Sequence, residues 1–122
     1  MAFSEGLQTI SGTAAADLSA RQYRCLKMNS SEQYAVAGDA GEVDGISQND
    51  PDAQGKAVTV GIAGISKLEA GGTVVPENYI SSDSVGRGVA GVSGEYIVGR
   101  AITGGTVGSI ISVAILKQRR RL

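Results

Sequence analysis

The sequence predicts an all-β fold made of short strands joined by tight turns. Sixteen of the eighteen glycines lie between Gly38 and Gly108, among runs of Val, Ile, Thr and Ala. Glycine supplies the positive-φ positions of turns, and β-branched residues favour the pleated surface of a strand. No stretch has the periodicity of a long amphipathic helix. A chain of 122 residues makes one domain with a modest core.

The N-terminal part of the chain divides into an arm and a first group of strands. Residues 1–20 carry few charges and few large apolar side chains, so we expect an extended arm that cannot fold alone. The first predicted strand is 21–28. Two further strands are predicted at 33–37 and 42–47, with a turn at 38–41 between them.

The clearest alternation follows a loop at 48–55, where nearly every residue is a turn former. In the predicted strand 57–62, Val58, Val60 and Ile62 share one face. The other face carries Ala, Thr and Gly, and such small residues let another strand or subunit approach closely.

Two more strands are predicted near the C-terminus, at 96–102 and 110–117. The second is apolar on both faces, as expected of a strand that is covered on both sides. The sequence Gly-Gly-Thr-Val occurs at 71–74 and again at 104–107. Recurring sequences such as this one lie at unequal spacings, which argues against a solenoid, so we interpret them as one turn-to-strand solution used more than once.

Composition argues against an enzyme. The chain has no His, the residue most often used as a general base and as a metal ligand. The single Cys25 cannot form an intramolecular disulfide, and we expect it to be a small buried apolar residue. No spacing among the twelve acids singles out a carboxylate pair. We therefore predict a non-enzymatic protein without cofactor or metal.

The charges are unevenly distributed. Six acids and no base lie between Met28 and Gly55, whereas four of the eleven bases lie in the last six residues, at Lys117, Arg119, Arg120 and Arg121. No aromatic residue near this basic tail could stack on bases, so we expect a protein partner or a solvated tail rather than direct contact with nucleic acid. No apolar stretch is long enough to span a membrane and no signal peptide is evident, so we expect a protein made in the cytoplasm with no membrane partner.

Three short motifs have ordinary structural explanations. The glycine pattern of 86–91 matches a dinucleotide-binding motif, but a strand rather than a helix is expected after it, so we interpret it as a cluster of turns. Residues 50–55 resemble the start of a calcium loop, but the twelfth position is Gly61 instead of Glu. Lys27 in Leu-Lys-Met resembles the modified lysine of biotin- and lipoyl-carrying domains, although it falls toward the end of a strand rather than at a hairpin tip.

The order of turns and strands over residues 17–116 resembles a known family. The residues that carry the resemblance are Asp17–Tyr23, Asp44–Pro51, Gly55–Val60, Gly64–Lys67, Ala70–Gly72, Ser81–Asp83, the Gly86-Arg87 turn and Tyr96–Ala101. This order is similar to that of the small capsid decoration proteins of tailed bacteriophages, which are also called head-stabilising or structural cement proteins.

The resemblance implies a compact small β-barrel or β-tulip. It also implies a protein on the outer surface of the mature phage head, bound to the major capsid protein as a trimer, with a dimer as the alternative, where it cements neighbouring capsomers against DNA pressure. In this interpretation 1–20 is a capsid-binding arm anchored by Phe3, Leu7 and Ile10, 21–116 is the barrel, and 117–122 is a basic tail that contacts an acidic neighbour.

Two other hypotheses stay open at the level of the sequence. The first is a soluble β-sandwich module that binds carbohydrate or a cell surface, for which the chain offers only four Tyr and one Phe as stacking residues. The second is a carrier domain modified at Lys27.

Overall fold

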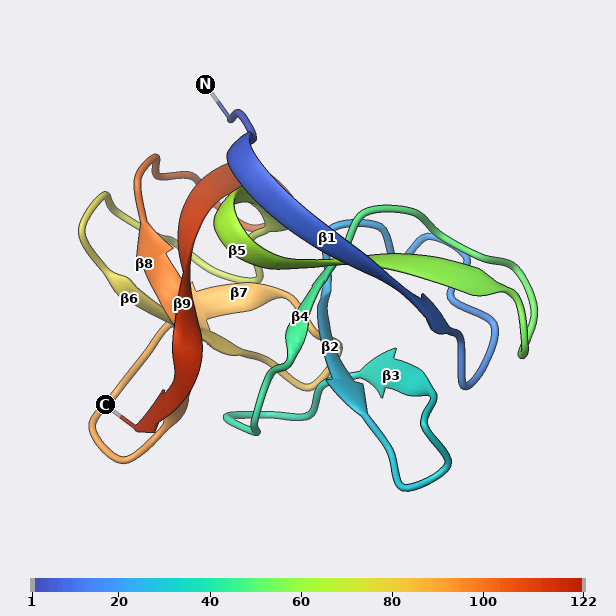
Figure 1. The fold of residues 1–122 in the computed structure, drawn as a ribbon. Helices are drawn as coiled ribbons and strands as arrows, with labels where there is room; N and C mark the ends of the chain where they lie inside the picture. The colour runs from blue at the N-terminus through green and yellow to red at the C-terminus, as the bar shows by residue number, and fades with distance from the viewer. Residues whose placement is uncertain (1, 122) are drawn as a thin grey trace.

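A computed structural model describes the backbone of residues 2–121 and the side chains of residues 2–116. Over these residues the chain forms strands and loops without a helix, which confirms the predicted all-β class (Figure 1). The strands are β1 (Glu5–Thr13), β2 (Cys25–Met28), β3 (Tyr34–Val36), β4 (Gly45–Ser47), β5 (Ala57–Glu69), β6 (Tyr79–Ser82), β7 (Gly88–Ala90), β8 (Tyr96–Ala101) and β9 (Ile110–Arg121).

The strands form one curled antiparallel sheet, a half-barrel. The hydrogen-bonded order is β3-β2-β4-β5-β9-β8-β6-β7, with β1 added on β5. The curl brings β2, next to one end of this order, close to β7 at the other end, because the amide of Cys25 in β2 donates to the carbonyl of Gly86 before β7, at 2.7 Å. A parallel bridge between Ala70 and Gly88 joins the end of β5 to β7.

β5 is the central strand of the sheet. Its residues Val60 and Gly61 pair with β4 on one edge and with β1 on the other. β9 pairs with the later part of β5, from Gly64 to Glu69, on the edge opposite β4. β1 and β9 therefore follow each other along the same edge of β5, and Figure 1 shows the start of β1 beside the start of β9.

Near its start, β1 crosses over β5 at a pair of glycines. Gly6 and Gly64 both have positive φ, at 58° and 92°, and a Cβ on Gly64 would overlap the carbonyl oxygen of Gly6. On the N-terminal side of this crossing point Phe3 lies on β9, where its amide donates to the Ser112 hydroxyl and its carbonyl accepts from the same hydroxyl, at 2.6 and 3.0 Å. The close approach requires a residue without a side chain at position 64.

Two clusters of buried apolar side chains form the core. Cys25 and Leu26 are neighbours in β2, and each belongs to a different cluster because successive strand residues point to opposite faces. The larger cluster is Cys25, Ala37, Ile46, Leu68, Ala70, Val74, Ile80, Val98, Ala101, Ile111 and Val113. The smaller cluster is Ala14, Leu18, Leu26, Tyr34, Val58 and Val60.

The structure agrees with several sequence expectations in detail. Val58 and Val60 are fully buried and Ile62 packs against them, as the alternation in 57–62 predicts. Cys25 is a buried free thiol. The first predicted strand begins late, at Cys25 instead of residue 21, because Tyr23 has a positive φ of 61° and turns the chain.

The ends of the chain lie on the sheet. Within the predicted arm, 1–20, β1 is extended and hydrogen-bonded along β5, and Ala14 and Leu18 are buried in the smaller core cluster. The backbone of the predicted tail continues β9 as far as Arg121, which pairs with Tyr96. What either segment binds in an assembly stays a prediction.

Candidate interaction surfaces

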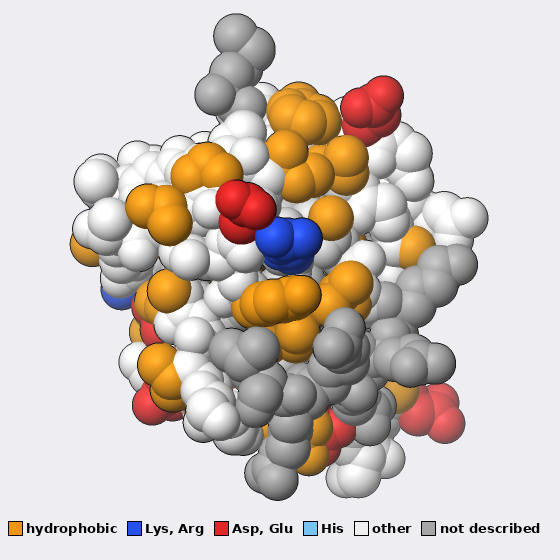
Figure 2. Space-filling view, turned by 90° about the vertical axis from the view of Figure 1, so that its left-hand side faces the viewer, with side chains coloured by type: hydrophobic (Ala, Val, Ile, Leu, Met, Phe, Trp, Pro, Cys, Tyr) orange, Lys and Arg blue, Asp and Glu red, His pale blue; other side chains and the backbone are white. Residues whose placement is uncertain are grey.

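An apolar rim stands on the two loops that precede β6 and β9. We define the docking rim by four exposed side chains, Val75, Ile102, Val107 and Ile110, of which Val107 is the most exposed at 63%. Figure 2 shows the side of the molecule that carries β6, β8 and β9, where hydrophobic side chains gather around one basic and one acidic side chain. Contiguous exposed apolar side chains of this kind mark interaction sites more often than isolated ones do.

The two loops of the docking rim hold each other. The amide of Val74 donates to the carbonyl of Gly105, and the amide of Gly105 donates back to the carbonyl of Val74, both at 2.9 Å. These residues belong to the two Gly-Gly-Thr-Val sequences, so the repeat found in the sequence is a pair of contacting loops. A Cβ at Gly104 would lie 2.6 Å from the carbonyl oxygen of Val74, so glycine permits the close approach.

Each loop ends in the same kind of turn. In Val75–Asn78 the third residue, Glu77, has a φ of 79°, and the Asn78 side chain accepts a hydrogen bond from the amide of Val75 at 3.1 Å. In 106–109 the third residue is Gly108, with a φ of 85°, and the Ser109 hydroxyl accepts from the first amide at 3.3 Å. These are type II turns closed by a side chain, and they hold the rim in one conformation.

A charged pair flanks the docking rim. The Arg100 guanidinium lies 3.2 Å from the Glu77 carboxylate and over the ring of Tyr79. A shallow hollow of about 250 Å³ adjoins this pair and is lined by Pro76, Glu77, Arg100, Ala101, Ile102 and Ala114. Because both charges are largely exposed, the pair contributes little to folding stability and is available to a partner.

A second candidate surface is a hollow bordered by β1, β2 and the middle of β5. We call it the Ile62 hollow; it measures about 440 Å³, and the described residues that line it are Ile10, Lys27, Met28, Asn29, Tyr34, Glu42, Asp44 and Ile62. Two large hydrophobic side chains are exposed there, Ile10 at 40% and Met28 at 42%. The hollow therefore combines exposed apolar side chains with polar groups and charges of both signs.

The predicted arm anchors lie in different environments. Phe3 is half-buried and its backbone is bonded to Ser112 of β9. Leu7 is half-buried, and its Cδ1 lies 3.0 Å from where a Cβ of Gly61 would be, so it covers the small-residue face of β5. Only Ile10 of the three is exposed. The side chains of the predicted tail residues Lys117, Arg119, Arg120 and Arg121 lie outside the described part of the chain.

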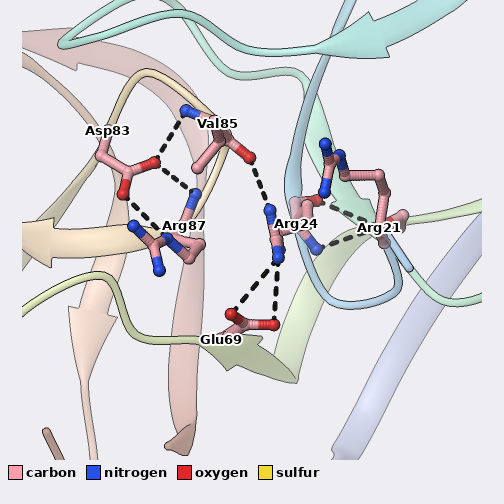
Figure 3. Close-up of polar contacts among 7 residues, drawn as sticks. Arg21, Arg24, Glu69, Asp83, Val85 and Arg87 are labelled. Atoms are coloured by element: carbon pink, nitrogen blue, oxygen red, sulfur yellow. Dashed lines mark hydrogen bonds and ion pairs between the residues drawn. The ribbon is translucent and has the colours of Figure 1, made fainter. Parts of the chain in front are cut away.

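A buried polar cluster connects the β6–β7 loop to β2 and β5 (Figure 3). The Arg24 guanidinium donates to the carbonyl of Val85 at 2.9 Å and forms an ion pair with Glu69 at 3.2 Å. Within the loop, Asp83 accepts hydrogen bonds from the amides of Val85 and Arg87, and it also forms an ion pair with the Arg87 side chain. Within the cluster the Nε of Arg24 is buried without a hydrogen-bond partner. Because the other contacts join the β6–β7 loop to β2 and β5, we assign the cluster to the closure of the half-barrel.

The nucleotide and metal motifs have the structural roles expected for them. Residues 86–91 form part of the β6–β7 turn and of β7. In the calcium-like loop, Asp52 pairs with Lys56 at 2.6 Å, and the side-chain oxygen of Asn49 accepts from the amide of Thr59. Among the described residues no group of three or more His, Cys, Asp or Glu side chains is placed to hold a metal ion.

Among the residues whose side chains the structure describes, the one large pKa shift belongs to a group unsuited to catalysis. Burial raises the pKa of the Cys25 thiol to about 12, so the thiol stays protonated and unreactive at neutral pH. Hydrogen bonds from Ser19 lower the pKa of Asp17, and Lys56 lowers that of Asp52, both at the surface. These shifts arise from loop geometry rather than from a reactive centre.

The alternative hypotheses find little support in the geometry. Lys27 lies within β2, paired with Ala35, and not at a hairpin tip where a carrier lysine would be modified. Tyr34 is buried, and the other aromatic residues, Phe3, Tyr23, Tyr79 and Tyr96, are half-buried. The ring faces of Tyr23 and Tyr79 lie under Lys67 and Arg100. None of these rings offers the open platform that a sugar-binding module uses.

Sequence reasoning missed the docking rim. Its four side chains are Val and Ile, which predict strands and core, and exposure of such residues in loops has no signature in a single sequence. The repeated Gly-Gly-Thr-Val sequence is the feature that could have pointed to the rim, because it marks two loops that begin with the same residues.

No helix in the described part of the chain is long and apolar enough to cross a membrane.

Comparison with known proteins identifies a similar fold. No family model matches the sequence, and no curated protein matches it. Among solved structures, the chain is similar to the N base of head fiber gp8.5 in bacteriophage phi29, with a TM-score of 0.71 at 18% sequence identity. The superposition covers 94% of this chain and 100% of the phage chain. The likeness therefore extends over the whole half-barrel and concerns the fold of the entire chain.

Proposed function

We propose that this chain is a non-enzymatic structural protein of a bacteriophage head. The observation that carries the proposal is the fold, which matches the N base of a phage head fiber over the full length of that base. The sequence resemblance to head decoration proteins points to the same particle from an independent direction. The described surface also suits assembly, because its apolar side chains stand on hydrogen-bonded loops rather than around a cluster of reactive groups.

The proposed partner is the major capsid protein, on the outer surface of the mature head. The protein would bind there as a homo-oligomer, a trimer in the first instance and a dimer as the alternative. Each copy contributes modest contacts, and repetition around a symmetric oligomer makes the total attachment strong. In this role the protein cements neighbouring capsomers.

Quantitative mass spectrometry of purified particles tests the central proposal. We expect a copy number comparable to that of the major capsid protein, and we expect antibodies against the chain to label intact particles. Near-absence from particles that contain the major capsid protein in full amount would overturn the proposal.

A fiber base is the second candidate, favoured by the name of the structural neighbour. A base anchors an appendage to the shell and has no need to strengthen it, whereas a cement does. Heads with and without the protein should therefore be heated while DNA release is followed with an intercalating dye. Cementing predicts release at a higher temperature when the protein is present; unchanged release with retained binding favours the base.

The arm can be tested without removing core residues. Because Ala14 and Leu18 are buried, the appropriate change is deletion of residues 2–4, which removes Phe3 and leaves β1 in place. If Phe3 anchors the protein to the shell, the deletion variant should fold and no longer co-sediment with heads. Undiminished co-sedimentation would exclude Phe3 as an anchor.

A further inference from the structure

The first residues of the chain lie on the half-barrel without contributing to its core. We define the strap as residues 2–8, all of which the structure describes. None of its side chains belongs to either core cluster, and only Ala2, Phe3 and Leu7 are half-buried, the others being exposed. By contrast, Ala14 just beyond the other end of β1 is fully buried. Displacement of the strap therefore leaves both core clusters intact.

One buried side chain of β9 holds the end of the strap. Ser112 is fully buried, and its hydroxyl accepts a hydrogen bond from the amide of Phe3 and donates one to the carbonyl of Phe3. A single serine thus satisfies both main-chain groups of one strap residue. Figure 1 shows this end of the chain beside the start of β9. The attachment of the strap to β9 consequently depends on one hydroxyl group.

Irregular backbone connects the strap to the rest of β1. The pairing with β5 shifts its register on both sides of Gln8, whereas it is regular from Thr9 to Thr13. Gly6 has a φ of 58°, and a Cβ added there would meet no atom within 4 Å. Glycine changes its backbone conformation more easily than other residues, and hinges are built from a few positions of this kind. The bulged segment around Gly6 therefore has the properties of a hinge.

From the single attachment at one end and the hinge near the other, we infer that the strap opens and closes on the folded half-barrel, with Ser112 as its latch and Gly6 as its hinge. Segments that bury few apolar groups open at a free energy far below that of global unfolding. The biological consequence rests on the proposed function, in which Phe3 anchors the protein to the shell. The closed strap keeps Phe3 on β9, so the contact with Ser112 is autoinhibitory and Phe3 reaches the shell when the strap is open.

Amide exchange measured residue by residue with NMR tests the strap in the isolated protein. The Phe3 and Ala14 amides are both hydrogen-bonded, at 2.6 and 2.8 Å, yet the protection factor of Phe3 should be at least about 100-fold lower. Ser112→Ala should lower protection throughout residues 5–8 by about tenfold, because the loss of two hydrogen bonds favours the open strap. Amides of β9 should keep their protection, since the Ser112 hydroxyl bonds to the strap and not to the sheet.

Two glycine variants form a matched pair for the hinge. Gly6 and Gly55 both have a positive φ with open space at the Cβ position, but Gly55 lies outside the strap. Gly6→Ala should lower the protection of the Phe3 amide by about tenfold through the cost of the left-handed backbone. Gly55→Ala should leave that protection unchanged.

Two results of these exchange measurements would overturn the inference. Equal protection of Phe3 and Ala14 would mean that the strap opens only when the whole protein unfolds. An effect of Ser112→Ala confined to the Phe3 amide, with residues 5–8 unchanged, would mean that the strap does not move as a unit.

Co-sedimentation with phage heads tests the autoinhibition separately. Ser112→Ala should bind heads about tenfold more tightly than wild type, because a larger fraction of the protein has a free Phe3. Unchanged binding together with lower protection of the strap would contradict the autoinhibitory role and leave the opening of the strap established. If wild type and Ser112→Ala both fail to bind heads, the proposed function fails, whereas the exchange result is unaffected.

Discussion

At the scale of single residues, Arg24 has the greatest influence on the closure of the half-barrel. Its guanidinium is nearly enclosed, and it reaches Glu69 on β5 and the carbonyl of Val85 in the β6–β7 loop. One side chain thus ties together segments that are far apart in the sequence. An intact buried ion pair contributes little net stability, because both charges lose their hydration. Removing one of the two charges is costly, because its partner stays buried and unpaired.

Substitution of Arg24 should be much more harmful than substitution of Arg100. Arg24→Ala leaves Glu69 and a buried carbonyl without their donor, and we expect it to lower the free energy of unfolding by about 3 kcal/mol. Arg100→Ala removes an ion pair whose side chains are 49% and 82% exposed, and it should cost less than about 1 kcal/mol. Urea denaturation of both variants checks this, and equal losses would contradict the assigned role of Arg24.

Cys25 gives the protein a predictable pH dependence. Because burial raises its pKa to about 12, the folded state keeps the thiol proton in a range where the unfolded chain, with a pKa near 9.0, releases it. The resulting stability is present below pH 9.0 and is lost as the pH rises toward 12. The loss approaches about 1.4 kcal/mol per pH unit.

The matched control for this prediction is Cys25→Ala. Tyrosines and lysines titrate in the same range, so the quantity to measure is the difference in unfolding free energy between wild type and variant at pH 8 to 11. That difference should shrink steadily above pH 9. A constant difference would mean that the thiol does not titrate as described.

At the scale of structural elements, the C-terminal half repeats one unit. A type II turn with a positive φ at its third position, at Glu77, Gly94 or Gly108, leads into a strand. The fourth residue of each turn closes it by accepting a hydrogen bond from the first amide. The second residue after the turn is always a buried isoleucine: Ile80, Ile97 or Ile111.

This repetition explains what could be predicted from the sequence. Glycine-rich turns and runs of Val and Ile identify β8, β9 and the first part of β5, predicted as 57–62 where the strand runs to Glu69, because these segments are long enough to show a pattern. β6 and β7 have four and three residues, too few for an alternation to be recognised. The pairing of β1 with β5 was also hidden, because most residues of β1 are exposed and carry no apolar periodicity.

The crossing of the N-terminal segment over β5 depends on Gly64. Gly55 has nearly the same φ, 90° against 92°, but a Cβ added there would meet open space. Comparing alanine substitutions at the two positions therefore distinguishes the cost of the backbone conformation from the cost of steric overlap. We expect Gly55→Ala to cost about 1 kcal/mol, from the left-handed backbone alone. Gly64→Ala adds a collision with the Gly6 backbone and should cost about 3 kcal/mol in total.

Thermal or urea unfolding measures both losses. Hydrogen exchange locates them: in the Gly64→Ala protein, amides of β1 should lose protection before those of β9. Equal stability of the two variants would show that the N-terminal segment does not lie over Gly64.

At the scale of the whole molecule, the two core clusters share their strands. β2 and β5 contribute side chains to both clusters, so neither cluster can persist while the other is lost. The strand order also joins segments distant in sequence, as in the pairing of β1 with β5 and of β5 with β9. Such non-local pairing favours slow, all-or-none folding.

We therefore expect a single cooperative unfolding transition. Val58→Ala in the smaller cluster and Val113→Ala in the larger one should each lower the free energy of unfolding by about 1 to 3 kcal/mol. The transition should move to lower denaturant without a second step. Tyrosine fluorescence and far-UV circular dichroism should give coincident curves. Two separated transitions in either variant would mean that the halves of the sheet unfold independently.

The candidate surfaces show the limit of sequence reasoning at this scale. Composition indicated an assembly protein, because the chain lacks His and any catalytic spacing, but it could not locate an interface. The sequence predicts an apolar anchor at Ile10 and places Met28 in a strand and Val107 in a turn, but all three side chains are exposed. Their exposure depends on where β9 leaves β5, which is a property of the folded sheet.

The shape of the Ile62 hollow depends on how much of one edge of β5 is occupied by β1 and how much by β9. β1 pairs with β5 from Ala57 to Ala63, and β9 pairs with it from Gly64 onward; the two strands overlap at Ile65, which pairs with both Glu5 and Ala114. Sliding β1 toward its C-terminal end would free Ala63 for β9 and narrow the hollow, whereas anchoring β1 more firmly keeps the hollow open. The position of β1 thereby determines how wide the Ile62 hollow is, although β1 borders the hollow on one side only.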